Sequence, residues 1–97
     1  MLTGKQRRYL RSMGHHLDPI VHVGKEGVSE GIIGALDAAL NEHELIKVRL
    51  GESAGGDRRV VSAAIAESSA ADLVQVLGRT LLLYRRRATD PTIKLPQ

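Results

Sequence analysis

A short stretch bracketed by glycine holds the residues whose types and spacing best suggest a binding chemistry. Gly24 and Gly27 enclose Lys25 and Glu26, and Ser29 follows as a good N-cap for a helix. Glycine lets another backbone approach closely, and a helix N-terminus offers N–H groups at the positive end of its dipole. The stretch therefore predicts a loop that holds phosphate. Glu26 would repel phosphate unless its side chain points away, and a tight turn that needs positive φ is the purely structural alternative.

The other polar groupings favour neither a metal site nor an enzyme. His15 and His16 are adjacent and point in different directions, and no ligand spacing connects them with the other histidines. Cysteine is absent, which excludes thiolate ligands and thiolate nucleophiles. A P-loop would need glycine where Pro19 stands and Ser or Thr where Glu26 stands, and a dinucleotide fingerprint would need glycine in place of His22. We expect no catalytic site, no cofactor and no metal ion.

The basic residues gather toward the two ends of the sequence. Residues 1–11 contain four basic side chains and no acid, residues 12–78 five basic and ten acidic, and residues 79–97 five basic and one acidic. Basic ends around an acidic middle favour a polyanionic partner over plain solvated charge. No apolar run approaches the roughly 20 residues of a membrane span, so a soluble, cytoplasmic protein is expected.

The predicted first helix carries much of this positive charge. Thr3 and Gln6 have the spacing of a capping box, and the helix should run to about Met13, before Gly14. Neighbours three and four residues apart share a helix face. The helix therefore exposes a basic face, formed by Lys5, Arg7, Arg8 and Arg11.

Two strands flank the glycine loop and its helix. Residues 20–23 and 45–50 alternate apolar and polar side chains, the period of a half-buried strand. A strand, a helix and a strand within about thirty residues form a βαβ unit with parallel strands. Lys47 and Arg49 then stand together on the solvent side of the sheet. Residues 51–56 form a small-residue loop that we expect to be mobile.

The second half of the chain predicts one more helix and a hairpin. The helix should run from residue 58 to about 69, with Val61, Ala64 and Ile65 on its buried face and Val60 beside them. Residues 73–77 and 80–85 read as strands joined by a two-residue type II′ turn that begins with Gly78. Residues 81–83 are continuously apolar, which indicates an interior strand. The expected fold is α/β, a two-layer αβαβαββ arrangement of three helices and a mixed four-stranded sheet. We predict one domain over residues 1–97, with a short C-terminal tail.

Five stretches, in this order, resemble a YhbY-type stand-alone CRM domain, the chloroplast RNA splicing and ribosome maturation module. They are LTGKQRRYLR (2–11), PIVHVGKEGVS (19–29), HELIKVRL (43–50), QVLGRTLLLYR (75–85) and KLP (94–96). The resemblance implies an RNA-binding protein whose partner is ribosomal RNA or an assembling large ribosomal subunit. Its glycine loop is similar to the GxxG loop of KH domains, which clamps backbone nucleotides. Here the loop joins a strand to a helix, whereas in KH domains it joins two helices, so the nucleotide path does not carry over.

The resemblance and the charge pattern together predict a set of RNA contacts. These are Gly24, Lys25 and Gly27 in the loop, Lys5, Arg8 and Arg11 on the first helix, and Lys47 and Arg49 on the second strand. The two tyrosines are the only large aromatic residues; Tyr84 is expected in the core or at the sheet margin, and Tyr9 is the better stacking candidate. We therefore predict shape-sensitive, salt-dependent binding to the RNA backbone.

A different class of function stays open. The run from Arg85 to Arg87, with the tail after it, could dock on an acidic protein, which would make the chain a protein–protein interaction module. Nothing in the sequence sets the oligomeric state, and a monomer is the default expectation.

Overall fold

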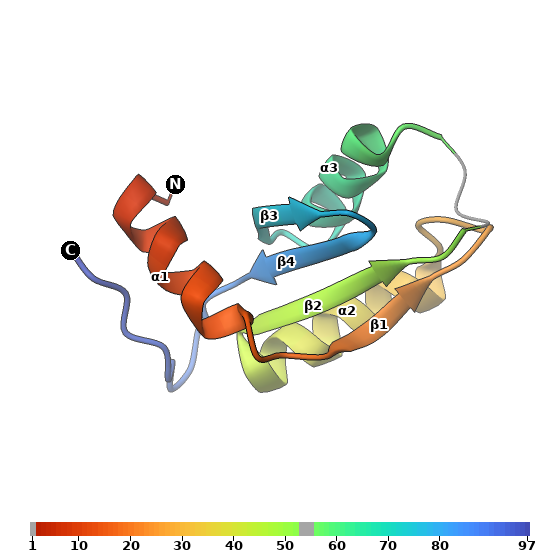
Figure 1. Ribbon diagram of the computed structural model, residues 1–97. Helices are drawn as coiled ribbons and strands as arrows, with labels where there is room; N and C mark the ends of the chain where they lie inside the picture. The colour runs from red at the N-terminus through yellow and green to blue at the C-terminus, as the bar shows by residue number, and fades with distance from the viewer. Residues whose placement is uncertain (1, 53–55) are drawn as a thin grey trace.

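The computed structural model describes residues 2–52 and 56–97, and the elements follow the predicted order (Figure 1). They are α1 (Gly4–Gly14), β1 (Pro19–Val23), α2 (Glu30–His43), β2 (Leu45–Leu50), α3 (Arg58–Ser68), β3 (Asp72–Leu77) and β4 (Thr80–Tyr84). The predicted αβαβαββ order, with three helices and four strands, is confirmed. The predicted loop at residues 51–56 lies partly outside the described residues, because 53–55 are not among them.

The four strands form one mixed sheet in the order β1-β2-β4-β3. β1 and β2 are parallel, and the other two pairs are antiparallel. Gly78 takes a φ of 61°, and the next residue does not have positive φ, as a type II′ hairpin turn requires. β4 is interior, so Leu81, Leu82 and Leu83 are all buried, as their continuous apolar run predicts.

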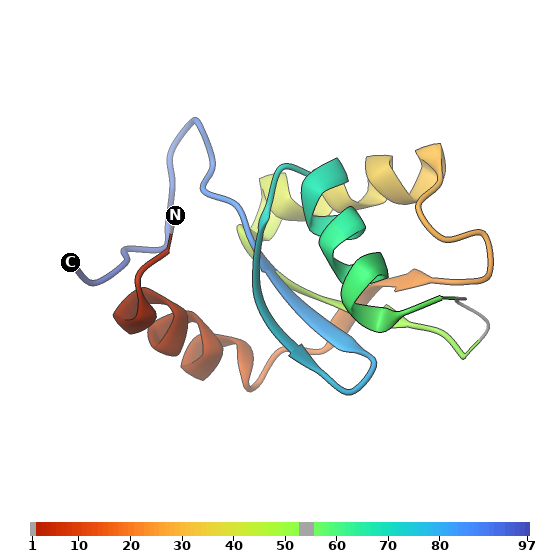
Figure 2. The ribbon, with the colours of Figure 1, turned by 90° about the horizontal axis from the view of Figure 1, so that it is seen from above.

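α2 and α3 cover one face of the sheet (Figure 2). Side chains start both helices: Ser29 Oγ accepts from the Ile32 N–H at 3.2 Å, and Asp57 Oδ1 accepts from the Arg59 N–H at 2.9 Å. The main core lies between these helices and the sheet. Its buried members are Val21, Val23, Leu36, Leu40, Ile46, Val48, Leu50, Ile65, Ala66, Leu81 and Leu83.

α1 lies on the opposite face, over only part of the sheet (Figure 2). Its buried residue Leu10 belongs to a second core with Leu45, Val74, Leu82 and Tyr84, against which the C-terminal residues Ile93 and Leu95 pack. Gly14 brings the end of α1 close to the sheet, since a Cβ there would lie 2.7 Å from Leu82 Cδ1. The two-layer description therefore fits the sheet with α2 and α3, and α1 adds a partial third layer.

The buried face of α3 is rotated from the predicted one. Ser62, Ile65 and Ala66 are buried, whereas Ala64 is exposed and Val60 is 67% exposed. α3 packs mainly on the edge strand β3, so the sheet ends before it can cover Val60. Within residues 2–52 and 56–97, no helix combines the length and the apolar character needed to cross a membrane.

Candidate nucleic-acid interface

The glycine loop is a tight turn at the end of β1. The Gly27 N–H donates to the Gly24 carbonyl at 3.0 Å, and Gly27 takes a φ of 64°. Gly24 has no such φ, and a Cβ built there meets nothing within 4 Å. The turn therefore requires glycine at position 27, as expected for a tight turn that needs positive φ. The fold has no such requirement at position 24.

The loop borders a shallow hollow at the N-terminus of α2, which is formed by residues 24–27, 29, 31 and 32. Ser29 Oγ takes the Ile32 N–H, and no described residue accepts from the preceding N–H group of Gly31. The side chains of Lys25 and Glu26 are both exposed. The hollow thus offers N–H groups and one lysine to an anion, beside the acids of Glu26 and the first turn of α2.

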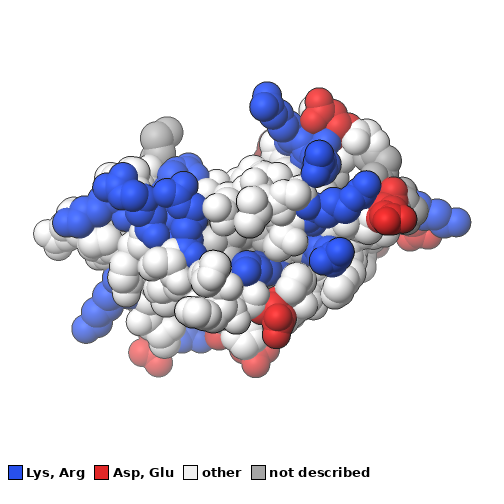
Figure 3. All heavy atoms as spheres, viewed as in Figure 1, with Lys and Arg blue, Asp and Glu red and all other residues white. Residues whose placement is uncertain are grey.

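The predicted basic residues lie along one face of the molecule rather than at one point. Figure 3 shows Lys and Arg side chains over α1 and again along the sheet toward the loop end. Arg11 and Lys47 line the same groove, between α1 and the sheet. Arg49 lies opposite His22 in the β1–β2 register, closer to the loop. α1 and the glycine loop stand at opposite ends of the molecule, whose longest dimension is 38 Å (Figure 1).

The predicted solvent side of the sheet is therefore only partly open. Lys47 is half-buried beside α1, because the second core covers that end of β2, and Arg49 is exposed. We call this surface the open basic face. It comprises Lys5, Arg8 and Arg11 of α1, Lys47 and Arg49 of β2, and Lys25 of the loop.

Most cations of the open basic face are free of internal partners. Lys5 Nζ donates to the carbonyl of Gln97 at 3.4 Å. The other five side chains form no hydrogen bond and no ion pair with any residue that the structure describes. Arg7, on the same helix, differs: it is half-buried, and its guanidinium donates to the Leu73 carbonyl at 2.7 Å, which ties α1 to β3. The free cations are thus available to an external anion.

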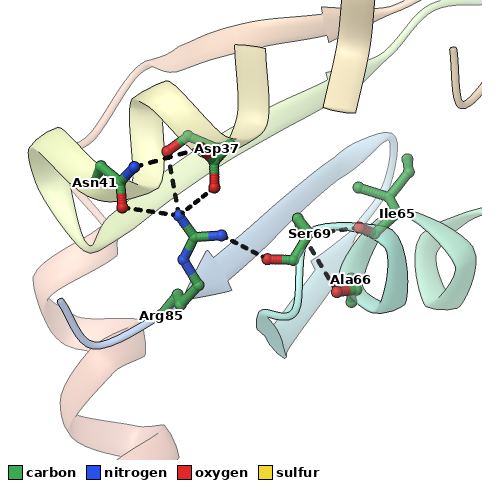
Figure 4. A network of polar contacts seen from close by, with 6 residues as sticks. All are labelled: Asp37, Asn41, Ile65, Ala66, Ser69 and Arg85. Carbon is green, nitrogen blue, oxygen red and sulfur yellow. Dashed lines mark hydrogen bonds and ion pairs between the residues drawn. The ribbon is translucent and has the colours of Figure 1, made fainter. Parts of the chain in front are cut away.

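Arg85, by contrast, is bound by residues of the fold itself (Figure 4). Its Nη2 lies 2.9 Å from Asp37 Oδ1 and 3.0 Å from Asn41 Oδ1, both on α2. Its Nη1 donates to the carbonyl of Ser69, at the end of α3, at 2.8 Å. Arg85 therefore joins both helices of one layer to the end of β4, and it is not available for docking.

Arg87 is also engaged, at the C-terminal end of α2. Its guanidinium donates to the carbonyls of Asn41, Glu42 and Asp90 at 2.8–3.3 Å. Only Arg86 of the arginine run is exposed. The predicted docking surface at residues 85–87 is thus reduced to one free arginine, because helix-end carbonyls and an aspartate occupy the other two.

Glu44 is a buried carboxylate that sequence reasoning missed. It takes positive φ, 62°, between α2 and β2, and it is fully buried. Its oxygens accept from the backbone N–H groups of Arg87, Thr92 and Ile93 and from the Thr92 hydroxyl, all at 2.8–2.9 Å. Burial alone would raise the pKa of Glu44, but these hydrogen bonds outweigh it and lower the pKa from 4.5 to about 2. Glu44 thereby fastens the C-terminal segment to the domain.

The tyrosines and histidines differ in how far they are exposed to a partner. Tyr84 is 4% exposed, in the core as predicted, and burial followed by the charge of Glu44 raises the pKa of its hydroxyl. Tyr9 is 40% exposed on α1. His15 and His16 stand edge to face, with ring centroids 5.2 Å apart. Across residues 2–52 and 56–97, no group of three or more His, Cys, Asp or Glu side chains is arranged to hold a metal ion.

Comparison with known proteins gives consistent matches. The family model of the CRS1 / YhbY (CRM) domain matches residues 2–85. The "Probable RNA-binding protein YqeI" of Bacillus subtilis is 44% identical over 96 residues, which cover 99% of this chain and all of that protein. A protein of Haemophilus influenzae named "RNA-binding protein" is 40% identical and covers 99% of this chain and 96% of its own length.

The fold also matches a solved structure. The solution structure of SAV1595 from Staphylococcus aureus, described as a candidate RNA-binding protein, superposes with a TM-score of 0.83 at 41% identity. The match covers 99% of this chain and all of that one.

Proposed function

This chain belongs to the CRS1/YhbY (CRM) domain family, and we propose that it binds RNA. The names of its relatives support this proposal, because they refer to RNA binding and to no reaction. RNA is also the partner that the basic ends of the sequence and the glycine loop favour.

The observation that carries the proposal is the set of free cations on the open basic face. Arg8, Arg11, Lys25, Lys47 and Arg49 have no internal partner among the described residues, whereas Arg85 and Arg87 do. Cations spread in a line suit the phosphates of an extended strand better than one compact anion. We propose that phosphates lie along this line, from the hollow beside Gly24 and Gly27, past Arg49 and Lys47, to α1.

The proposal extends to ribosomal RNA or a precursor of the large ribosomal subunit as the target, and to a role in ribosome assembly. The likeness of the sequence to YhbY-type proteins supports this part. The proposal includes a cytoplasmic, monomeric protein that acts as one domain over residues 1–97. Sedimentation with ribosomal particles from a lysate tests the target: co-migration with a large-subunit precursor at low salt, lost at high salt, is expected. Migration as free protein at low salt would refute the ribosomal target.

A salt titration tests the phosphate contacts. Affinity for RNA should fall steeply as salt rises, and each lost contact should reduce the slope of log K against log salt by about 0.7–1. Lys25→Ala and Arg49→Ala should each do so. Arg86→Ala, which removes an exposed arginine outside the face, is the matched control and should leave the slope unchanged. An affinity that hardly depends on salt would contradict the proposal.

Gly24→Asp tests the loop without disturbing the turn. Position 24 has open space and no positive φ, so an aspartate fits the fold, whereas aspartate at position 27 would strain it. The new carboxylate should repel phosphate and weaken RNA binding about tenfold or more. The matched control is Ala35→Asp, which adds the same charge on the exposed face of α2. Equal RNA affinity in the two aspartate variants would argue against a loop contact.

A further inference from the structure

A groove between the C-terminal end of α1 and the open part of the sheet differs chemically from the rest of the open basic face. It encloses about 570 Å³, within the range of roughly 300–1,000 Å³ that is usual for small-ligand sites. It exists because Gly14 lets α1 end against Leu82, after which the chain turns away through His15 and His16. Beyond this contact the sheet has no covering helix, so the groove stays open at one side.

The wall of the groove combines three kinds of group. Arg11 and Lys47 supply positive charge, and neither has a partner among the described residues. Leu77, at the end of β3, is 71% exposed and supplies an apolar surface. Gln75, opposite Leu82 in the β3–β4 register, supplies an amide whose donor and acceptor no described residue uses.

These three kinds of group correspond to the parts of a nucleotide. Phosphate needs cations, the faces of a base need an apolar or aromatic surface, and a base edge offers a donor beside an acceptor, which an amide can pair. A phosphate alone would not need the leucine or the amide. A protein helix would not need two free cations and a free amide in one short groove.

We propose that this groove holds one unstacked base of a single-stranded RNA segment, with its phosphates on Arg11 and Lys47. The base lies against Leu77 and the imidazoles of His15 and His16, and Gln75 pairs with its edge. The inference rests on the proposed RNA binding and deepens it by naming single-stranded RNA as the substrate class. Because an amide can pair with the edge of any base, the site tolerates different sequences.

The test separates base contacts from phosphate contacts. Binding of the full chain to an oligouridylate of about twelve nucleotides is compared with binding to an abasic ribose-phosphate strand of equal length. The unaltered protein should bind the oligouridylate about tenfold more tightly than the abasic strand, because only the oligouridylate has a base to fill the groove. Leu77→Ser and Gln75→Ala should bring the ratio of the two affinities close to one, with no change in the salt slope.

Two controls keep the result interpretable. Leu77 is too exposed for its loss to unfold the protein, so Leu77→Ser serves even if Gln75→Ala is unstable. Val76→Ala changes the residue between them, which pairs with Leu81 and points to the other face, and it should preserve the ratio. A ratio near one in the unaltered protein, or a ratio that both groove variants leave intact, would overturn the inference and leave RNA binding standing. Failure to bind either strand would overturn the inference, and failure to bind ribosomal RNA as well would overturn the proposed RNA binding.

Discussion

The two arginine-rich regions of this chain look alike in sequence and serve different ends in the structure. On α1, Arg8 and Arg11 point to solvent with no internal partner among the described residues. After β4, Arg85 and Arg87 donate to carbonyls and side chains of α2 and α3. The difference lies in what surrounds each run, because helix ends and their unpaired carbonyls lie beside β4. A cluster of cations therefore indicates a binding surface only once its internal acceptors are known.

The second region stabilises the C-terminal segment. We call it the clasp, and it comprises Glu44, Arg85 and Arg87 with the segment that Glu44 binds at residues 87, 92 and 93. Glu44 accepts from the backbone of that segment, and the two arginines bind the helices next to it. We expect substitutions in the clasp to change the free energy of unfolding, and substitutions on the open basic face to change RNA affinity instead.

The largest expected effect in the clasp follows from Glu44→Ala. The change leaves the part-buried N–H groups of residues 87, 92 and 93 without an acceptor, and each such loss costs roughly 1–3 kcal/mol. The free energy of unfolding, measured by urea denaturation, should fall by about 3 kcal/mol or more. Glu44→Gln keeps one acceptor oxygen and should lose less. A loss below about 1 kcal/mol for the alanine variant would show that the clasp does not stabilise the fold.

Acid should weaken the clasp through the same carboxylate. The pKa of Glu44 is lowered from 4.5 in the unfolded chain to about 2 in the folded protein, so the folded state favours the ionised form. The resulting stability is fully present above about pH 4.5 and is lost progressively as the pH falls toward 2. Urea midpoints measured across this range should drop more steeply for the unaltered protein than for Glu44→Gln. Parallel curves for the two proteins would contradict this assignment.

A pair of adjacent arginines makes the comparison sharper. Arg85→Ala removes the hydrogen bonds to Asp37, Asn41 and the Ser69 carbonyl, and we expect it to cost about 1–2 kcal/mol, since part of the site is exposed. Arg86→Ala removes the exposed neighbour and should change the free energy of unfolding by less than about 0.5 kcal/mol. Equal losses, measured by urea denaturation, would mean that Arg85 acts only through its charge.

The sequence predicts what local chemistry determines. The capping box of Thr3 and Gln6, the N-cap at Ser29 and the turn at Gly78 are confirmed, because each depends on residues at most three positions apart. Alternating apolar residues likewise predicted β1 and β2.

What the sequence could not predict depends on distant contacts. Glu44 and its partners are more than forty residues apart, and no local pattern marks the carboxylate as buried. The groove joins α1 to β3 and β4 across an even wider gap in the sequence, so neither Gln75 nor Leu77 stood out in the sequence. Val60 was expected at the core because helical periodicity gives a face but not the edge of the sheet beneath it.

The smallest expected effect concerns the two glycines of the loop. It tests whether the loop beside the open basic face contains a residue that the fold requires. Gly27→Ala places a Cβ at a φ of 64°, so it should cost about 1–2 kcal/mol in the free energy of unfolding. Gly24→Ala adds a methyl group to open space without positive φ and should leave the free energy of unfolding within about 0.5 kcal/mol.

RNA affinity, measured on folded protein, should fall more for Gly24→Ala than for Gly27→Ala. If the RNA backbone approaches the loop closely, the methyl group of Gly24→Ala stands in its way, and affinity should fall although stability does not. A Gly24→Ala protein that is as stable as the unaltered one and binds RNA equally well would show that position 24 serves neither the fold nor a close approach. The loop would then contribute through Lys25 alone, and the cations of α1 and β2 would hold the strand.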